Sequence, residues 1–151
     1  MSAAASVVEV RHLFAGYDGK PVLRDISMEV QAGEVMVIIG GSGSGKSTLL
    51  KQLLGLHVPT AGSCRVLGVD IVKARSRELL AMRRRIGVAF QTGALFSSMT
   101  VGENIMLPLR EHTRLDESTM RIMMRLKLDQ VAMSGTEDRM PAELSGGMIK
   151  R

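Results

Sequence analysis

A glycine-rich stretch constrains the fold of this chain more than any other feature. It reads GGSGSGKS from Gly40 to Ser47 and fits the pattern G-x-x-x-x-G-K-[ST]. The apolar run 35–39 precedes it and predicts a short parallel strand buried on both faces. From Lys46 onward leucines recur at helical spacing, and Gly55 is the expected end of that helix. The pattern is therefore strand, glycine loop, helix.

This succession predicts a phosphate-binding site. Glycines let successive backbone N–H groups converge on an anion, and a helix N-terminus adds about half a positive charge. Lys46 is expected to reach the outer phosphates, and the Ser47 hydroxyl to ligate Mg²⁺. The alternative is a flexible turn with a chance lysine, and the strand-loop-helix context argues against it. The sequence predicts nucleotide binding without deciding the base.

Bulk composition indicates an ordinary globular chain. Of 151 residues, 45% are hydrophobic and 23% charged, which predicts one domain with a real core. The single cysteine, Cys64, and the absence of a secretory pattern at the start indicate a reducing cytoplasm. No apolar run approaches the roughly 18 to 20 residues that cross a bilayer. Any membrane association is expected to be peripheral or through a partner.

The elements around the loop predict a mixed sheet in the first part of the chain. The turn at Gly19 and Pro21 separates two strands and indicates an antiparallel start. Gln91 follows a further strand and is expected to end it. The expected strands are 7–10, 22–30, 35–39, 64–67 and 86–90, with a helix at 78–84.

The second part of the chain predicts helices. Thr100 and Glu103 form a capping-box pair that opens a helix, and Pro108 is expected to kink or end it. Another helix is predicted from Asp116 to Val131. The methionine side chains of this helix are expected in the core more than on a binding surface. For this helix and the one around Pro108 as a whole, docking against a transmembrane partner and packing within the domain are equal alternatives. These methionines are Met120, Met123 and Met124.

The net charge of +5 includes a basic cluster. Such a cluster indicates nucleic acid, anionic lipid headgroups or simply a solvated basic face. Aromatic residues make up only 3% of the chain, so there is no stacking platform for single strands, and the solvated face is favoured. The cluster consists of Arg75, Arg77, Arg83, Arg84 and Arg85.

Two further residues, Tyr17 and Gln91, are candidate ligand contacts because of their positions relative to the loop. Tyr17 lies ahead of it and either stacks on a base or is an ordinary strand residue. Gln91 is expected at the carboxyl end of a strand, where ligands of open α/β sheets collect, and its amide is suited to touch Mg²⁺ or orient a water. Taken alone, Gln91 is more simply a loop glutamine.

The order of these features, followed by Leu144-Ser145-Gly146-Gly147, resembles the ATP-binding subunits of ABC transporters. In that family the stretch from Leu144 is the signature motif, which here closes with Met148 instead of the usual glutamine. The resemblance implies an α/β fold of the P-loop NTPase class, with an antiparallel β subdomain, a partial RecA-like core and an α-helical subdomain. It also implies ATP and Mg²⁺ as cofactors, and a second ATPase subunit paired head to tail.

The resemblance assigns roles residue by residue. Lys46 and Gln91 are the expected catalytic residues, and Ser47 and Gln91 the expected Mg²⁺ ligands. The signature is expected to hold the γ-phosphate of nucleotide bound by the partner subunit, where side chains at its glycines would obstruct the approach. The expected nucleotide contacts are Tyr17, Gly40, Gly41, Ser42, Gly43, Ser44, Gly45, Lys46, Ser47 and Thr48, and the expected signature contacts in trans are Leu144, Ser145, Gly146 and Gly147.

A closer likeness lies in the stretches 90–96, 99–101 and 108–113, which resemble the ATPase of Mla-type, MCE-associated phospholipid transporters. This implies a permease, MCE-domain and periplasmic lipid-carrier partners, no nucleic acid, and a cytoplasmic location on the inner face of the inner membrane. The alternatives are the ATPase of another ABC importer and a soluble tandem-cassette ABC protein.

The family pattern also bears on domain organisation. We expect one ABC ATPase domain over 1–151, with a β subdomain and loop core over 1–95, a helical subdomain over 96–145 and the signature over 144–151. The family's Walker B strand and catalytic glutamate are not matched, since the chain reaches only the first turn of the signature helix. We therefore expect a fragment, truncated before Walker B, that binds but does not hydrolyse ATP and exposes apolar surface near 35–39. His12, His57 and His112 precede the signature and are expected to be surface residues.

Overall fold

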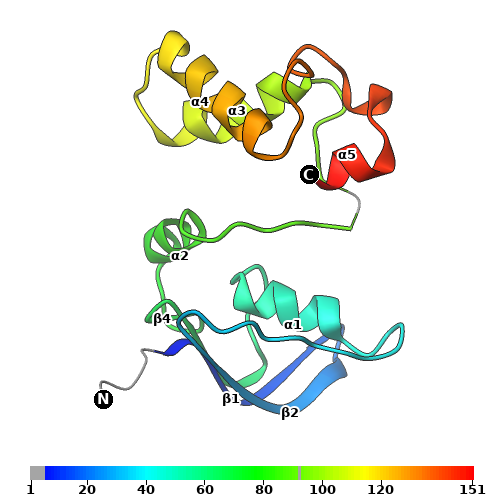
Figure 1. Ribbon diagram of the computed structural model, residues 1–151. Helices are drawn as coiled ribbons and strands as arrows, with labels where there is room; N and C mark the ends of the chain where they lie inside the picture. The colour runs from blue at the N-terminus through cyan, green and yellow to red at the C-terminus, as the bar shows by residue number, and fades with distance from the viewer. Residues whose placement is uncertain (1–5, 92) are drawn as a thin grey trace. The chain divides into compact units, whose positions relative to one another are not determined.

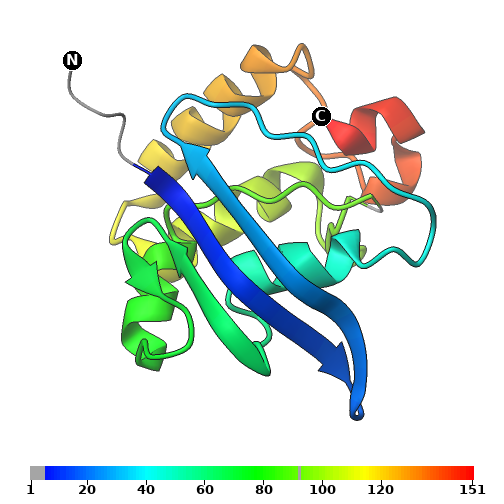
Figure 2. The ribbon, with the colours of Figure 1, turned by 90° about the horizontal axis from the view of Figure 1, so that it is seen from below.

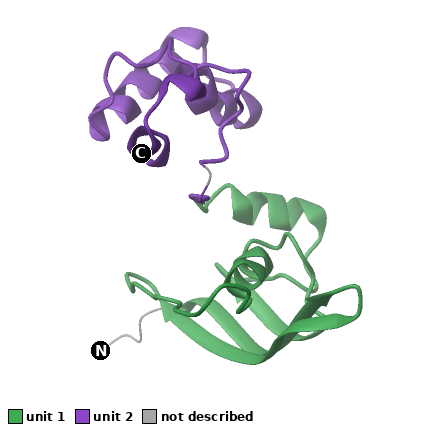
Figure 3. Ribbon diagram, turned by 90° about the vertical axis from the view of Figure 1, so that its right-hand side faces the viewer, with its two compact units in different colours: residues 1–87 green, residues 88–151 purple. Residues whose placement is uncertain are grey.

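The computed structural model of the protein describes residues 6–91 and 93–151. The chain divides into two compact units, Met1–Gly87 and Val88–Arg151, which Figure 3 draws in different colours. Each unit has a hydrophobic core of its own. Residues 1–5 and Thr92, the latter within the lipid-transporter likeness at 90–96, lie outside the described part.

The first unit is built on an antiparallel sheet with the strand order β2-β1-β3-β4 (Figures 1 and 2). Asp18 and Gly19 join the first two strands, and both have positive φ, as a tight Asp-Gly hairpin requires. The predicted antiparallel start is confirmed, with longer strands than expected. The elements are β1 (Ser6–Tyr17), β2 (Lys20–Gln31), α1 (Lys46–Leu53), β3 (Ala61–Val66), β4 (Val69–Asp70) and α2 (Ser76–Arg83).

A bulge in β1 aligns the side chains that form the core. The pairing with β2 shifts register between Val10 and Leu13, and His12 within the bulge has φ 47°. Because Leu13 lies an odd number of residues after Val10, such an irregularity is needed to bring both side chains to one face. Gly62 fits beside the bulge, where a Cβ would lie 2.1 Å from the His12 carbonyl oxygen. Only glycine permits this approach.

One face of the sheet and helix α1 enclose the first core (Figure 2). Val10 and Leu13 of β1 are fully buried, and Leu49 of α1 and Met82 of α2 pack in the same cluster. Burying a side chain of this size contributes about 2 kcal/mol, so the cluster fixes both helices on the sheet. The remaining buried members are Ala15, Leu23, Cys64, Val66 and Ile71.

Helix α1 ends as the sequence predicts, and Arg83 of α2 caps it. Gly55 follows the helix with φ 64°. The Arg83 guanidinium donates from Nε to the Leu54 carbonyl oxygen at 2.9 Å and from Nη2 to that of Gly55 at 2.5 Å. A guanidinium at these carbonyls also complements the negative end of the helix dipole. Arg83 is therefore a structural residue and not part of a solvated basic face.

Two predicted strands are absent from the described sheet. Residues 35–39 were expected to be buried on both faces, but they form no strand, and Val35 and Ile39 are 87% and 91% exposed. Residues 86–90 form no strand either, so Gln91 lies in a turn and ends no strand. A parallel strand needs neighbours to pair with, and the four described strands pair only with one another. The separate expectation that a chain without the flanking parallel strands exposes apolar surface near 35–39 is confirmed.

The second unit is helical, and its elements are α3 (Val101–His112), α4 (Glu117–Gln130), η1 (Pro141–Glu143) and α5 (Gly146–Lys150). The capping box is confirmed: the Thr100 hydroxyl accepts from the Glu103 N–H at 3.2 Å, and the Glu103 carboxylate accepts from the Thr100 N–H at 2.8 Å. Pro108 does not end α3, which continues to His112.

The predicted helix at 116–131 is α4, and the side chain of its N-cap Asp116 accepts from the Thr119 N–H at 3.0 Å. Hydrogen bonds from Ser118 and Thr119 lower the pKa of the Asp116 carboxyl. Met120 and Met124 are buried in the second core, as predicted, and the exposed apolar side chains of α4 are Ile122 and Leu126 instead. The buried members of this core are Val101, Met106, Met120, Met124, Leu128 and Met133.

Among residues 6–91 and 93–151, none of the helices combines the length and apolar character needed to cross a membrane. The longest, α4, has 14 residues.

The Arg83 cap predicts a measurable loss of stability when it is removed. Arg83→Met keeps the aliphatic stem but leaves two carbonyl oxygens at the end of α1 without their charged donor. We expect the free energy of unfolding to fall by about 2 kcal/mol, measured by urea denaturation of the natural-length protein. Arg77→Met on the exposed side of the same helix is the matched control and should change it by less than about 0.5 kcal/mol. Equal effects from the two variants would contradict the cap.

Candidate functional site

The glycine loop passes through two left-handed residues before α1 begins. Gly43 has φ 77° and Gly45 has φ 92°, a region that favours glycine. Gly45 is the N-cap of α1, and its carbonyl oxygen accepts from the Leu49 N–H at 2.8 Å. No side chain caps this N-terminus, so the first N–H groups of the helix are left to bind an anion.

Packing fixes some of the loop glycines and not others. A Cβ on Gly45 would lie 2.8 Å from Leu23 Cδ2, and one on Gly40 would lie 2.7 Å from Ser44 Oγ. A Cβ on Gly41 would meet nothing within 4 Å. Gly45 is therefore required by its left-handed backbone as well as by packing, whereas a side chain at Gly40 needs only a shift of the Ser44 hydroxyl and one at Gly41 meets no obstacle.

The Lys46 ammonium lies inside the loop. Nζ donates to the carbonyl oxygens of Gly40 at 2.8 Å and Gly41 at 2.6 Å, and to Ser44 Oγ at 3.1 Å. Phosphate oxygens are stronger acceptors for an ammonium than neutral carbonyls, so a phosphate compares favourably with these partners. The loop encloses a depression of 160 Å³ that is lined by Val22, Gly43, Ser44, Gly45, Lys46, Ser47 and Thr48.

The hydroxyls after Lys46 differ in exposure. Ser47 is exposed in the first turn of α1, while the Thr48 side chain is 8% exposed and packs inward. The Ser47 hydroxyl is an oxygen donor of the kind that Mg²⁺ prefers when phosphates and water complete its shell; the Gln91 amide carries another such oxygen, in the second unit. Among the described residues, no group of three His, Cys, Asp or Glu side chains is placed to hold a metal by itself. The residues present fit a metal that arrives with a phosphate.

Tyr17 lies at the end of β1 with two partners that sequence analysis missed. Its ring meets the His57 ring edge to face, with centroids 5.1 Å apart. The Lys51 ammonium of α1 lies 5.7 Å from its centroid, within cation–π range. His57 is therefore half-buried against an aromatic ring and is not a plain surface residue. Tyr17 keeps 37% of its surface exposed, which leaves room for a further stacking partner.

Gln91 belongs to the second unit, where its segment contacts the signature helix. Gln91 is exposed and lines a depression of 480 Å³ together with Ile149 and Lys150 of α5. Gly93 has φ 80°, and a Cβ there would lie 2.4 Å from Ile149 Cγ2. Sequence analysis did not single out Gly93, although a glycine two residues after Gln91 was a usable signal.

The signature residues form the start of α5. Ser145 is its N-cap, and its hydroxyl accepts from the Met148 N–H at 3.3 Å. Leu144 and Met148 pack against the second core, which anchors this helix to α3 and α4. A Cβ on Gly146 or Gly147 would meet nothing within 4 Å, and neither glycine has a positive φ. The chain itself therefore imposes no requirement for glycine at these two positions.

Cys64 takes no part in this chemistry. It is fully buried, and burial together with the negative charge of Asp70 raises the pKa of its thiol to about 11. At neutral pH the thiol stays protonated and is a poor nucleophile.

The uncapped helix start, the left-handed glycines and the internal ammonium together form a small cationic depression of the kind that suits a phosphate group. The family described as ABC transporter matches residues 23–151. The chain belongs to this family, which confirms the resemblance drawn from the motifs.

Similar proteins include a probable ribonucleotide transport ATP-binding protein, mkl, of Mycobacterium leprae. It is 43% identical over 144 residues, which are 95% of this chain and 42% of that protein. The intermembrane phospholipid transport system ATP-binding protein MlaF of Haemophilus influenzae is 38% identical over 146 residues, 97% of this chain and 55% of that protein. The chain thus spans about half the length of these relatives.

The fold has counterparts among solved structures. The ATP-binding cassette MJ0796, as a dimer in a post-hydrolysis state bound to ADP and Pi, superposes with a TM-score of 0.84 at 28% identity, over 94% of this chain and 65% of that one. cbiO1 from Clostridium perfringens, part of an ABC transporter complex, gives 0.81 at 28% identity, over 96% and 58%. The predicted fold class, an ABC ATPase domain with an antiparallel β subdomain and a helical part, is confirmed.

Proposed function

We propose that this protein is the ATP-binding subunit of an ABC transporter and couples ATP hydrolysis to the movement of phospholipid. The observation that carries the proposal is the loop ending at Lys46, in which an ammonium and the free N–H groups of α1 converge on one small depression. A triphosphate is the ligand that satisfies both the cation and the amides at once.

Each residue of the loop has a proposed task in holding nucleotide. Lys46 exchanges its carbonyl partners for phosphate oxygens, and the amides of residues 40–48 line the phosphates. Tyr17 offers the rest of its ring to the adenine, while His57 and Lys51 hold the ring in place. Thr48 contributes through its backbone, since its side chain packs inward. The ring and the loop belong to the same unit, which supports one shared ligand.

Mg²⁺, when bound, would supply positive charge that offsets the negative charge of the phosphates. The Ser47 hydroxyl and the Gln91 amide oxygen are the proposed ligands of this chain. Gln91 also lines the depression beside α5. The segment that carries this proposed ligand is therefore the one that contacts the signature helix through Gly93.

We propose that a second copy of the subunit completes the site. A Cβ on Gly146 or Gly147 would meet no atom of this chain, so packing within the subunit does not require glycine there. The proposed reason for the two glycines is close approach of the partner's nucleotide to this backbone. The N-terminus of α5, with the Ser145 hydroxyl, is suited to the γ-phosphate held by the partner. The dimeric cassette bound to ADP and Pi supports such a pairing. We also propose that the chain consists of a β subdomain with the loop core over 1–95, a helical subdomain over 96–145 and the signature over 144–151.

Phospholipid is the proposed cargo because the MlaF relatives belong to intermembrane phospholipid transport systems and share 36–38% of residues with this chain. On that basis the partners are a permease, an MCE-domain protein and a periplasmic lipid carrier, and the subunit works peripherally on the inner face of the inner membrane. The second candidate is ribonucleotide transport, favoured by the 43% identity to mkl.

Replacing the loop lysine tests ATP hydrolysis. In the natural-length protein, Lys46→Ala removes the cation that lies in the phosphate depression, and we expect the ATPase rate to fall by about 10² to 10³. Phosphate release is the measurement. Lys73→Ala, at an exposed lysine outside the loop, should keep the rate within about twofold. A Lys46→Ala protein that still turns over at the parent rate would refute the proposal.

The proposed role of the signature glycines in trans predicts a variant that is stable but inactive. Gly147→Val enters open space in a helix, so we expect unfolding stability unchanged or higher by about 0.5 kcal/mol. Its methyl groups would block a partner's γ-phosphate, so ATPase activity and ATP-driven dimerisation should fall at least tenfold. Calorimetry should still detect ATP binding. Ala142→Val adds similar bulk just before the motif and should remain active. A fully active Gly147→Val subunit would count against pairing through this surface.

The cargo can be tested on the transporter complex reconstituted in vesicles. We expect ATP to drive exchange of a labelled phospholipid between the complex and a lipid-accepting protein, whereas labelled ribonucleotides stay where they are. The Lys46→Ala complex is the control for ATP dependence. ATP-driven movement of ribonucleotide with no movement of lipid would establish the second candidate instead.

A further inference from the structure

Helix α2 carries a strongly basic face that neither the fold nor the nucleotide site uses. At about 100° of rotation per residue, Arg77, Leu80 and Arg84 fall on one side of α2 and its C-cap, and Arg85 follows in the turn after the helix. All four are exposed, and Leu80 keeps 44% of its surface accessible. We name these four residues the basic face of α2.

The opposite side of α2 is fixed to the first unit. Met82 is buried in the first core, and Leu79 and Ile86 pack against that core. Arg83 is engaged with the carbonyl oxygens at the end of α1. The helix therefore cannot rotate to bury its basic face, and the exposure of the arginines is a property of the fold.

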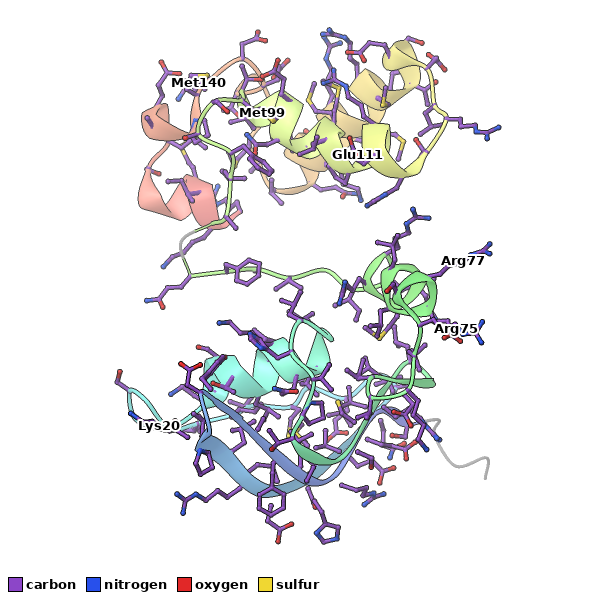
Figure 4. The ribbon with its side chains drawn as sticks, turned by 180° about the vertical axis from the view of Figure 1, so that it is seen from behind. Lys20, Arg75, Arg77, Met99, Glu111 and Met140 are labelled. Atoms are coloured by element: carbon purple, nitrogen blue, oxygen red, sulfur yellow. The ribbon has the colours of Figure 1, made fainter. Side chains whose placement is uncertain are left out.

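The charges of this face are not neutralised locally. Within residues 6–87, no carboxylate lies within ion-pair distance of Arg77, Arg84 or Arg85. The one acidic residue of α2, Glu78, uses its carboxylate to accept from the Arg75 N–H at 2.7 Å. Figure 4 shows the side chains of Arg75 and Arg77 extending from α2 away from the sheet. An anionic partner therefore meets several unpaired guanidinium groups at once.

We propose that the basic face of α2 contacts the anionic headgroups of a bilayer. Guanidinium groups form paired hydrogen bonds with phosphates, and their long stems let the charge stay at headgroup level while apolar carbons lie deeper. An exposed leucine among three arginines suits such an interface, since Leu80 is shielded from water when it enters the headgroup boundary. The attraction falls off within a Debye length, so it acts only when the subunit lies directly on the membrane.

The face suits lipid better than nucleic acid. Residues 72–85 contain no aromatic side chain to stack on a base. A phosphodiester backbone has no apolar layer to receive Leu80, whereas a bilayer has one. The proposal goes beyond the proposed function, because it assigns a direct lipid contact that holds whichever cargo the transporter moves and does not involve Lys46.

Vesicle co-sedimentation of the natural-length subunit tests this contact. We expect binding to vesicles of phosphatidylcholine with about one-third phosphatidylglycerol, weak binding to phosphatidylcholine alone, and loss of binding between about 0.1 M and 0.5 M salt. The triple variant Arg77→Gln, Arg84→Gln, Arg85→Gln should lower the partition coefficient at least tenfold. Replacing all three by lysine should retain most of the binding.

The matched control removes three charges from the sheet instead: Arg11→Gln, Lys20→Gln and Arg24→Gln, all exposed. It should change binding by less than about twofold. ATP titration of the α2 variant should be unaffected, so a failed lipid result leaves the nucleotide site to be judged separately. Equal losses in both triple variants, or undiminished binding of the α2 variant, would overturn the proposal. Tighter binding to a duplex DNA than to the anionic vesicles, lost in the same variant, would replace it with a nucleic-acid surface.

Discussion

The ammonium of Lys46 on the carbonyl oxygens of its own loop is the interaction on which the site depends. It gathers the loop into a closed curve, and the left-handed Gly45 then directs the chain into α1 with the helix N–H groups uncapped. Positive charge and free donors thereby share one small volume. Other parts of the first unit serve to hold this curve: Leu23 packs beneath Gly45, and Leu49 fixes α1 on the sheet.

Local patterns predicted well wherever the chain satisfies its own hydrogen bonds. The capping box at Thr100 and Glu103, the helix stop at Gly55 and the helix at 116–131 were all readable, because each depends on residues a few positions apart. The start of helix α1 at Lys46, directly after the glycine loop, was readable for the same reason. Of the two outcomes predicted for Pro108, a kink or an end of the helix, the structure excludes the end, since α3 continues to His112.

Predictions failed where structure depends on distant partners. The run 35–39 has the composition of a buried strand, yet composition cannot state which strands lie beside it. The same holds for 86–90 and for Gln91 as a strand end. Contacts such as Tyr17 with His57, or Gly93 with Ile149, join residues 40 and more than 50 positions apart and leave no periodic signal in either segment. Arg83 was predicted to belong to a solvated basic face, but it donates to a carbonyl oxygen at the end of α1, which only folding brings near it.

The guanidinium of Arg83 gives α1 a second attachment at the end remote from the nucleotide. The helix is about 12 Å long, with phosphate donors at one end and α2 fastened at the other. A short, well-packed rod transmits axial displacement with little bending. An axial displacement of the glycine loop would therefore reach α2 through α1 and the two Arg83 hydrogen bonds, which links the position of the loop to the arginine-bearing side of the unit.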